Sequence, residues 1–578
     1  MTILNNMTFK IAGAAGQGVE SSGAGFAEAL AKGGLHVFGL QDYMSRIRGG
    51  LNFFQIRVHE QPLYAHEDAV HILLPLNEEA LEAYQGEVVK GGGVIYDDGL
   101  KVDTDKIADQ GRKAMPVPLI EIAKDNGDKV MANTAALGAA AGVVDYSYER
   151  LADVIRANFK RKGDEIVAAN LRVGRAAYLH AQEKYAADFE WKLKPVAKAP
   201  KRMVMTGNQA FALGALAGGC RFMAAYPMTP STSIIEWMAR HQERYGVVTK
   251  HAEDEIAAVC MAIGANFAGA RAMVATSGGG FSLMVEALGL AGRCEVPLVV
   301  VEGQRGGPST GLPTRTEQGD LLFVLHASQG EFARLLLAPG TIEEYFACGW
   351  RAFNLAEKYQ TPVLVLADEL LASSVRTIEV KDIDFDAVVI DRGKLLSTEE
   401  LDGLTEPYKR HLFTKDGISP RAIPGHPKAV YATASDEHDE FGHITEEMHN
   451  RRKMMQKRMK KLETARQDIH APARYGPAKA PIILACWGST YGVLREVVDR
   501  LDGQARLVHF CDLWPFPAKA AAEALRGGKL VTVECNYSGQ FKRLLQGETC
   551  IAVDHMILRY DGRPFSPESI LDGLKEVL

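Results

Sequence analysis

The chain has 578 residues, of which 47% are hydrophobic and 24% are charged, as is ordinary for a globular protein of several domains. Acidic residues outnumber basic ones by 72 to 66, and the formal net charge of -6 excludes a polybasic nucleic-acid binder. The longest apolar runs, such as the one around residues 298–301, are far shorter than the ~20 residues that span a bilayer. The first ten residues have neither a basic leader nor an apolar core, so we expect no secretion signal.

The eight cysteines are widely spaced, and the closest two, Cys535 and Cys550, are 15 residues apart. No spacing fits a zinc site or an iron–sulfur cluster held by this chain alone. We therefore expect reduced thiols and a cytoplasmic protein.

The pattern along the chain predicts the α/β fold class with three domains. In the first, a strand at 9–12 runs into a glycine-rich turn at 13–18 and then a helix to about Lys32. Further strands of that segment are expected at 53–58, 70–75 and 93–96. Residues 191–202 contain two prolines and five basic residues without an apolar period, which predicts a linker.

The second α/β segment begins at Met203, and its strands are expected at 222–226, 272–275, 298–302 and 362–367. Residues 380–475 are rich in proline and glycine and then highly charged. A solvated helix is expected at 446–467, packing through Met448, Met454, Met455 and Met459. The last segment is α/β again, with strands at 482–485, 507–510 and 530–534.

The turn at 13–18 reads G-x-x-G-x-G between a strand and a helix. Glycines let the backbone approach a ligand, and the free N–H groups of the helix start favour an anion. Ser45, Arg46 and Arg48 follow about 30 residues later, and guanidinium groups pair well with phosphate. A tight turn with surface arginines is the equally open alternative.

Three motifs of the second segment follow expected strands, where ligands gather in open α/β sheets. The first is the stiff loop 226–231, whose Ser231 could instead cap the next helix. The second is Glu253, Asp254 and Glu255 at the start of an apolar helix. The helix dipole accounts for the first two acids, but Glu255 borders a run that should be buried. The third is the glycine cradle at 276–280.

Glu255 with Gly264 and then 276–280 resembles the pyrimidine-binding domain of thiamine-diphosphate enzymes. The loops 226–231 and 307–320 together resemble the α subunit of 2-oxoacid:ferredoxin oxidoreductases, nearest to the 2-oxoglutarate (2-ketoglutarate) branch. Gly279 departs from the pattern, because proline is common there; glycine keeps the loop but loosens it.

The resemblance implies five segments. They are a γ-type domain at 1–190, the linker at 191–202, a pyrimidine-binding domain at 203–378, a connecting segment with a charged helix at 379–475, and a transketolase C-terminal-like domain at 476–578.

The resemblance also implies roles for individual residues. Glu255 would pair with the pyrimidine ring nitrogen, and Glu253 is the second candidate. The other implied cofactor contacts are Tyr226, Pro227, Ser277, Gly278 and Gly279, and the implied substrate contacts are Thr229, Ser231, Thr314 and Arg315. The implied coenzyme A contacts are Gly13, Gly16, Gln17, Gly18, Ser45, Arg46 and Arg48. Arg315 could alternatively tie down its own loop through Glu317 or Asp320.

The implied reaction is the reversible oxidative decarboxylation of 2-oxoglutarate with coenzyme A to succinyl-CoA and CO2, with electrons passed to ferredoxin. The chain lacks a G-D-G motif followed by asparagine and lacks clustered cysteines. The resemblance therefore implies a β subunit that holds magnesium, the diphosphate and a [4Fe-4S] cluster, in an (αβ)2 assembly. Two alternatives stay open: the same chemistry on pyruvate or a branched-chain or aryl 2-oxoacid, and an assembly subunit without catalysis.

The stretch 436–443 contains two histidines among carboxylates and could be read as a metal site. A polar loop with capping acids is the commoner structure for such a pattern, so we predict no metal site in this chain.

Overall fold

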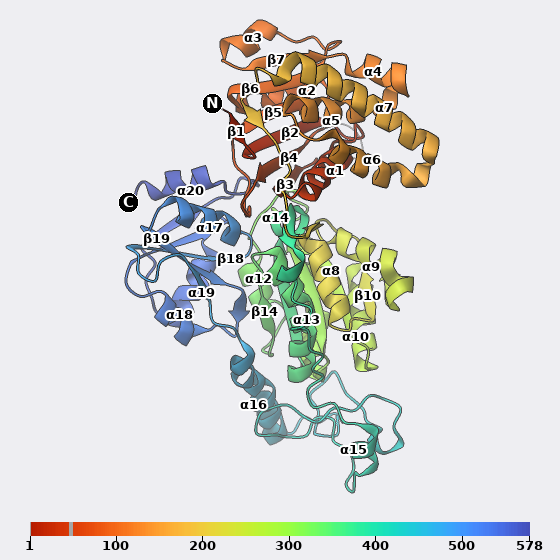
Figure 1. The fold of residues 1–578 in the computed structure, drawn as a ribbon. Coiled ribbons are helices and arrows are strands. Elements are labelled where there is room, and N and C mark those ends of the chain that lie inside the picture. Colours follow the sequence, from red (N-terminus) through yellow and green to blue (C-terminus); the bar gives the residue numbers. More distant parts are fainter. Residues whose placement is uncertain (1, 45–49, 578) are drawn as a thin grey trace. The chain divides into compact units, whose positions relative to one another are not determined.

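The computed structural model describes residues 2–44 and 50–577, and the chain forms two compact units. The first unit comprises Met1–Thr206, Ser373–Asp382 and Ser566–Asp572, and the second comprises Gly207–Ala372, Ile383–Phe565 and Gly573–Leu578. Both units are α/β, as expected, and three large sheets form their centres (Figure 1).

The first unit is built on an eight-stranded sheet in the order β7-β6-β5-β2-β4-β3-β16-β9. Its strands are β2 (Met7–Ala14), β3 (His36–Asp42), β4 (Leu51–His59), β5 (Val70–Pro75), β6 (Val88–Asp97), β7 (Lys113–Val117), β9 (Arg202–Thr206) and β16 (Val375–Glu379). The four strands expected from the sequence lie within β2, β4, β5 and β6, and the helix after the glycine turn is α1 (Val19–Lys32).

Small residues let two helices of this unit approach closely. Helix α5 (Ala132–Val143) packs on α7 (Asp164–Ala181), and α6 (Tyr148–Phe159) lies between them in the chain. A Cβ added at Gly138 would lie 2.2 Å from the Gly174 carbonyl oxygen, so only glycine allows this approach. The small residues of α5 and α7 thus allow the backbones of the two helices to lie in direct contact.

Residues Ser373–Asp382 belong to the first unit, although the sequence pattern does not indicate this. Strand β16 falls inside the expected domain 203–378, yet it pairs antiparallel with both β3 and β9. The Val37 amide also donates to the Thr377 hydroxyl at 3.0 Å. Strand β9 likewise begins at the last residue of the expected linker, because the open edge of β16 supplies hydrogen-bond partners.

The second unit contains a seven-stranded sheet in the order β11-β10-β12-β13-β15-β14-β20. Its strands are β10 (Phe222–Ala225), β11 (Val248–His251), β12 (Ala272–Ser277), β13 (Leu298–Gln304), β14 (Leu335–Leu337), β15 (Pro362–Asp368) and β20 (Asp512–Trp514). All pairs are parallel except β14 with β20. Helices α8 (Gly207–Ala217), α9 (Thr232–Tyr245), α10 (Glu255–Phe267), α11 (Gly278–Cys294) and α13 (Ile342–Tyr359) connect and cover the strands.

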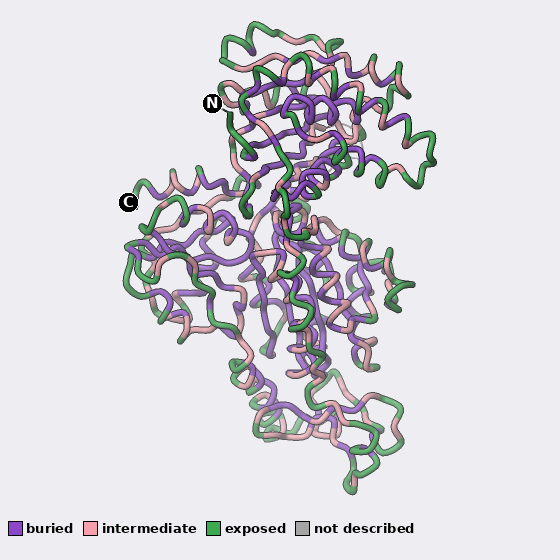
Figure 2. The backbone as a smooth tube through the Cα atoms, viewed as in Figure 1, coloured by how far each residue is buried: buried purple, intermediate pink, exposed green. Residues whose placement is uncertain are grey.

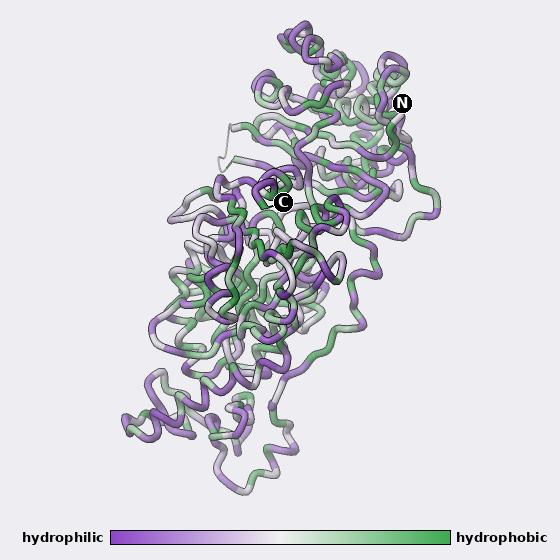
Figure 3. The backbone as a smooth tube through the Cα atoms, turned by 90° about the vertical axis from the view of Figure 1, so that its left-hand side faces the viewer, coloured by the Kyte–Doolittle hydropathy of each residue, from purple (hydrophilic) through white to green (hydrophobic). Residues whose placement is uncertain are grey.

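The central strands of this sheet are buried on both faces, as parallel strands usually are. In β13, Leu298 and Val300 pack into the core that includes residues of α10 and α11. The alternate residues Val299 and Val301 pack into the core on the α8 and α13 side. Buried residues accordingly follow the sheets in Figure 2, and the hydrophobic stretches lie mainly inside in Figure 3.

The C-terminal residues form a five-stranded sheet in the order β17-β19-β18-β21-β22. Its strands are β17 (Ala473–Tyr475), β18 (Ile482–Trp487), β19 (Ala505–Phe510), β21 (Lys529–Glu534) and β22 (His555–Leu558), with helices α17 (Thr490–Arg500), α18 (Ala518–Ala524) and α19 (Gln540–Thr549). The three expected strands are all present. Strand β20 leaves this sheet and joins the seven-stranded one, where Leu336 pairs with Trp514.

The connecting segment has little regular structure besides α15 (Thr398–Asp402) and the expected charged helix, α16 (Met448–Ala465). The expected methionine face of α16 is wrong: Met448 is 78% exposed, and among the four methionines only Met454 is buried. The buried face is mostly cationic and contains Lys457, Arg458 and Lys461. These cations are buried because carboxylates elsewhere in the chain pair with them, and the sequence pattern of the helix does not indicate those partners.

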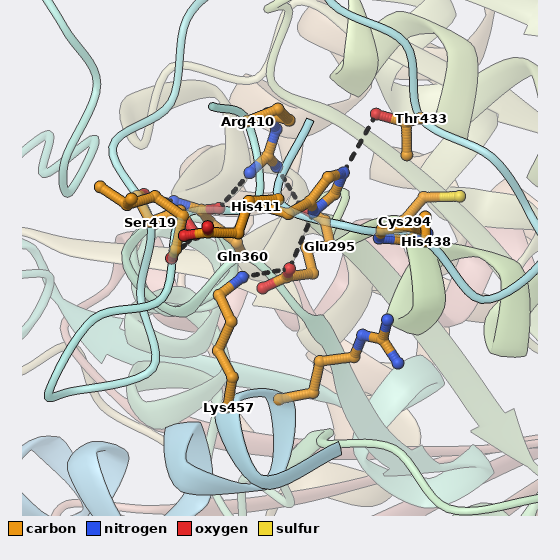
Figure 4. A network of polar contacts seen from close by, with 12 residues as sticks. Cys294, Glu295, Gln360, Arg410, His411, Ser419, Thr433, His438 and Lys457 are labelled. Carbon is orange, nitrogen blue, oxygen red and sulfur yellow. Dashed lines mark hydrogen bonds and ion pairs between the residues drawn. The ribbon is translucent and has the colours of Figure 1, made fainter. Parts of the chain in front are cut away.

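Glu295 is the centre of one group of these contacts, which we call the Glu295 cluster: Glu295, Gln360, Arg410, His411, Lys457 and Lys461. Figure 4 shows all of these residues except Lys461 with labels. Lys457 and Lys461 each approach the buried carboxylate at 2.5 Å, and the His411 ring lies 2.9 Å from it. Burial alone would raise the pKa of Glu295, but the two lysines and His411 hold it well below its usual value. The cluster thereby attaches α16 and the loop around His411 to the end of α11.

Two further carboxylates repeat this arrangement. Glu357 receives Arg271 at 2.7 Å and Arg392 and Arg421 at 2.6 Å each. Glu437 accepts from Arg293 at 2.6 Å and also pairs with Arg458. Charge pairing thus replaces an apolar core in much of the connecting segment.

Replacing Glu295 with glutamine (Glu295→Gln) should lower the free energy of unfolding by about 3–5 kcal/mol, because two buried lysines lose their counter-charge. The change is measured by urea denaturation of the purified chain. The matched control is Glu463→Gln on α16, the helix that carries the two lysines; its ion pair with Lys460 is exposed, so its loss should leave the midpoint unchanged. Equal effects of the two substitutions would contradict the role of the cluster.

Candidate active site

Several turns meet at the carboxyl edge of the seven-stranded sheet. The loop 226–231 follows β10, α10 follows β11, and α11 follows β12. Because neighbouring parallel strands end at the same edge, these turns surround one region, which is where open α/β sheets bind ligands.

Glu255 is the buried carboxylate of this region. It is the first residue of α10, and Asp254 caps the helix by accepting from the Ala257 amide at 2.7 Å. Glu255 is only 4% exposed, whereas Glu253 is exposed. The Oε1 atom of Glu255 has no hydrogen-bond partner among the described residues. A buried acceptor without a donor is costly, so this atom marks a place for a ligand.

Gly280 makes room for that carboxylate. A Cβ added there would lie 2.7 Å from both Cγ and Oε1 of Glu255 and 2.1 Å from the Thr276 hydroxyl. The neighbouring Ser277 is completely buried, and its hydroxyl also lacks a partner in the described part of the chain. Gly278 is half-buried and Gly279 is exposed, so the helix start is a backbone cradle open on one side.

The loop 226–231 is held by its own polar groups. The Ser231 hydroxyl donates to the Met228 carbonyl at 2.8 Å, and Asn208 donates to the Pro230 carbonyl at 2.8 Å. Ser231 therefore supports the loop, although it precedes α9 and its side chain makes no cap bond there. Tyr226 and Pro227 are exposed.

Thr229 lies next to an arginine that sequence reasoning missed. Arg305 Nη1 donates to the Thr229 carbonyl at 2.7 Å. The available signal was its place directly after β13, at the same edge as the other motifs. A guanidinium group held at this sheet edge suits a bound carboxylate.

The loop 306–320 closes this side of the sheet. Thr314 is buried, and Arg315 is half-buried and packs against Gly562, where an added Cβ would lie 3.0 Å from the Arg315 Cβ. Gln318 anchors the loop by donating to the Trp487 carbonyl and accepting from the Cys535 amide, both at 2.9 Å. The C-terminal sheet thereby positions the loop.

The glycine turn of the first unit forms a separate site. Gly16 and Gly18 have φ values of 89° and 73°, which favour glycine, and Gly18 precedes α1. The Gln17 side chain accepts from the Ala14 amide at 2.6 Å and so braces the turn. The turn borders one hollow of about 450 Å³ and another of about 910 Å³. Ser45, Arg46 and Arg48 lie outside the described residues.

Neither the cysteines nor the 436–443 loop forms a metal cluster in the part of the chain that the structure describes. The eight cysteines are free thiols, and Glu437 of that loop pairs with arginines. Among the same residues, no helix combines the length and apolar character needed to cross a bilayer.

Two family models match the chain. The thiamine-diphosphate-binding model of pyruvate flavodoxin/ferredoxin oxidoreductase matches residues 213–457, and the pyruvate ferredoxin/flavodoxin oxidoreductase model matches residues 8–179. The 2-oxoacid:ferredoxin oxidoreductase subunit alpha of a Sulfolobus species is 34% identical over 99% of this chain and 97% of its own length. The chain belongs to the 2-oxoacid:ferredoxin oxidoreductases.

Other relatives of this α subunit point the same way. The 2-oxoglutarate oxidoreductase subunit KorA of Mycobacterium tuberculosis is 30% identical over 95% of this chain and 88% of its own length. A solved 2-oxoglutarate:ferredoxin oxidoreductase from Magnetococcus marinus, with 2-oxoglutarate, coenzyme A and succinyl-CoA bound, is 33% identical. The structural match covers 99% of this chain and 99% of that chain, with a TM-score of 0.92. The α/β fold and the oxidoreductase family expected from the sequence are both confirmed.

Adding a methyl group at Gly280 (Gly280→Ala) should displace Glu255 and cost about 1–3 kcal/mol of stability through overpacking. The matched control is Gly279→Ala, where the nearest atom to an added Cβ is Met228 Sδ at 3.9 Å. Thermal unfolding of both variants measures the difference, and the control should melt no lower than the parent chain. Similar losses in both variants would mean that the cradle is not shaped by Glu255.

Proposed function

We propose that this α subunit supplies the pyrimidine side of a thiamine-diphosphate site and the substrate pocket of a 2-oxoglutarate:ferredoxin oxidoreductase. The reaction is the oxidative decarboxylation of 2-oxoglutarate with coenzyme A to succinyl-CoA and CO2. The observation that supports it most is the buried, unpartnered Oε1 of Glu255 inside the region matched by the thiamine-diphosphate-binding model.

Glu255 fits the pyrimidine ring of the cofactor. A buried carboxyl group with one unpartnered oxygen can hydrogen-bond a ring nitrogen of the pyrimidine and pass a proton to or from it. The Ser277 hydroxyl and the open edge at Gly278 and Gly279 complete a polar cradle beside it, and the exposed Tyr226 and Pro227 would contact the ring from the neighbouring loop. When bound, thiamine diphosphate supplies the electron sink for decarboxylation.

The substrate carboxylate next to the oxo group would be held by Thr229 and Arg305, which are joined by a 2.7 Å hydrogen bond. Arg315 and Thr314 in the loop 306–320 would hold the second carboxylate, which distinguishes 2-oxoglutarate from pyruvate. The bound 2-oxoglutarate in the solved relative supports this choice of substrate.

Coenzyme A would bind at the glycine turn of the first unit, through Gly13, Gly16 and Gly18 with Ser45, Arg46 and Arg48. The hollow beside the turn and the N–H groups at the start of α1 suit a phosphate-bearing ligand. Gln17 would support coenzyme A binding by holding the turn in shape through its hydrogen bond with the Ala14 amide, and would not contact the ligand itself.

A β subunit would supply magnesium, the diphosphate site and the [4Fe-4S] cluster, and would pass electrons to ferredoxin within an (αβ)2 assembly. The outer face of α10 suits such a partner, because Ile256, Met261 and Phe267 are 50%, 38% and 37% exposed. No charged side chain of this helix is exposed, and such an apolar face beside a half-built site favours a protein contact.

Replacing Glu255 with glutamine (Glu255→Gln) should lower kcat of the assembled enzyme by about 100-fold or more, because the shared proton is lost while size is kept. Glu253→Gln is the matched control and should retain activity, since Glu253 is exposed. If the control lost activity and Glu255→Gln did not, the proton would belong to Glu253.

Replacing Arg315 with leucine (Arg315→Leu) should lower kcat/KM for 2-oxoglutarate relative to 2-oxobutyrate. An unpaired substrate carboxylate in a closed pocket costs about 2–5 kcal/mol, and only the dicarboxylic substrate has the second carboxylate. Measuring both substrates with both proteins gives the ratio. An unchanged ratio would show that another residue holds the distal carboxylate.

A further inference from the structure

Glu302 is a second buried carboxylate near the candidate site, separate from Glu255. It lies near the end of β13, in register with Thr276 of β12 and Leu366 of β15. Its side chain is completely buried. Neither of its oxygens receives an N–H or hydroxyl donor from the described residues.

The group that faces Glu302 is another carboxyl, that of Asp320. The two side chains lie within hydrogen-bonding reach of each other. Two ionised carboxylates are both acceptors and repel, so this contact is a bond only when one proton lies between them. The Asp320 amide donates to Gln304 at 3.2 Å, which fixes Asp320 over the end of β13.

Asp320 also touches the cofactor cradle. A Cβ added at Gly278, the first residue of α11, would lie 2.6 Å from Asp320 Oδ2. The carboxyl pair therefore lies beneath the same turn as the unpartnered Ser277 hydroxyl.

Arg305 connects the pair to Thr229. It is close enough to interact electrostatically with both carboxyl groups, and it donates to the Thr229 carbonyl. With one proton on the pair, the pair and Arg305 together have no net charge. With the proton lost, one excess negative charge faces the place where an anionic substrate must bind.

We propose that Glu302 and Asp320 share one proton and act as a positioning pair, which sets through Arg305 how strongly the Thr229–Arg305 site holds the 2-oxoacid carboxylate. This inference rests on the proposed function, in which Thr229 and Arg305 bind that carboxylate. The proton keeps the guanidinium group available to the substrate.

The surroundings favour the protonated form of the pair. Burial first, and then the Asp320 charge, raise the pKa of Glu302 well above its usual value, and burial raises the pKa of Asp320 as well. Besides Arg305, the titratable groups that face the pair among the described residues are Glu317 of the same loop and Tyr345 of α13. Both are neutral or negative, so Arg305 is the cation that senses the pair.

The test measures KM and kcat for 2-oxoglutarate with the assembled enzyme from about pH 6 to about pH 9, above the ordinary pKa range of a carboxyl group. In the parent enzyme, KM should rise about threefold or more towards alkaline pH. In Glu302→Gln, the amide donates to Asp320 at every pH, so KM should stay flat and kcat at neutral pH should be kept. Asp320→Asn reverses donor and acceptor and should flatten KM in the same way, which keeps the test valid if one variant fails to fold.

Glu331→Gln is the control, because it removes an exposed carboxyl of the same unit that contributes to the pKa of neither member of the pair; its KM should follow the parent profile. Parallel profiles in the parent and both pair variants would overturn the inference, and so would a loss of kcat at all pH values with KM unchanged. Arg305→Lys separates the two claims. A raised KM at neutral pH supports the substrate site, while an unchanged KM overturns that site and the inference with it.

Discussion

A carboxylate taken out of water must find a cation, a donor or a proton, and this requirement organises the second unit. Glu295, Glu357 and Glu437 are each surrounded by lysines or arginines from distant parts of the chain. These contacts attach the connecting segment, which has little apolar core of its own. The buried carboxyls at the sheet edge are different: Glu255 has a free oxygen, and Glu302 faces Asp320. Because the other three acids are paired with cations, Glu255 and Glu302 are the ones to which we assign roles in the proposed site.

The parallel sheet positions the side chains of the candidate site. Strands buried on both faces fix the ends of β10, β12 and β13, and glycines let helix starts and side chains approach at those ends. The loop 306–320 is in turn held by Gln318, which bonds to the ends of strands in the C-terminal sheet. Three sequence segments far apart along the chain thus form one candidate site within one unit.

Local patterns predicted what depends on neighbours in sequence. The period of apolar residues indicated β2, β5, β13 and α16, and the acid before an apolar helix indicated Glu255. Partners far away in sequence were not predictable in this way. The cationic face of α16 is buried because carboxylates outside the helix pair with it, such as Glu295, which is 162 residues from Lys457. The expectation of a methionine face was wrong because those partners are not visible in the local pattern. Strand β16 returns to the first sheet without any local signal. For Arg305, its place directly after β13 was a signal, but its contact with Thr229, 76 residues away, was not predictable from the local pattern.

The central claim is that this chain is the pyrimidine half of a shared cofactor site. Calorimetric titration of thiamine diphosphate with magnesium into the chain alone, and into the chain assembled with a β subunit, tests it most directly. The account predicts tight binding only in the assembly, weakened by about tenfold or more in Glu255→Gln, because the buried carboxyl contact is lost. Binding to the chain alone with the affinity of the assembly would contradict it.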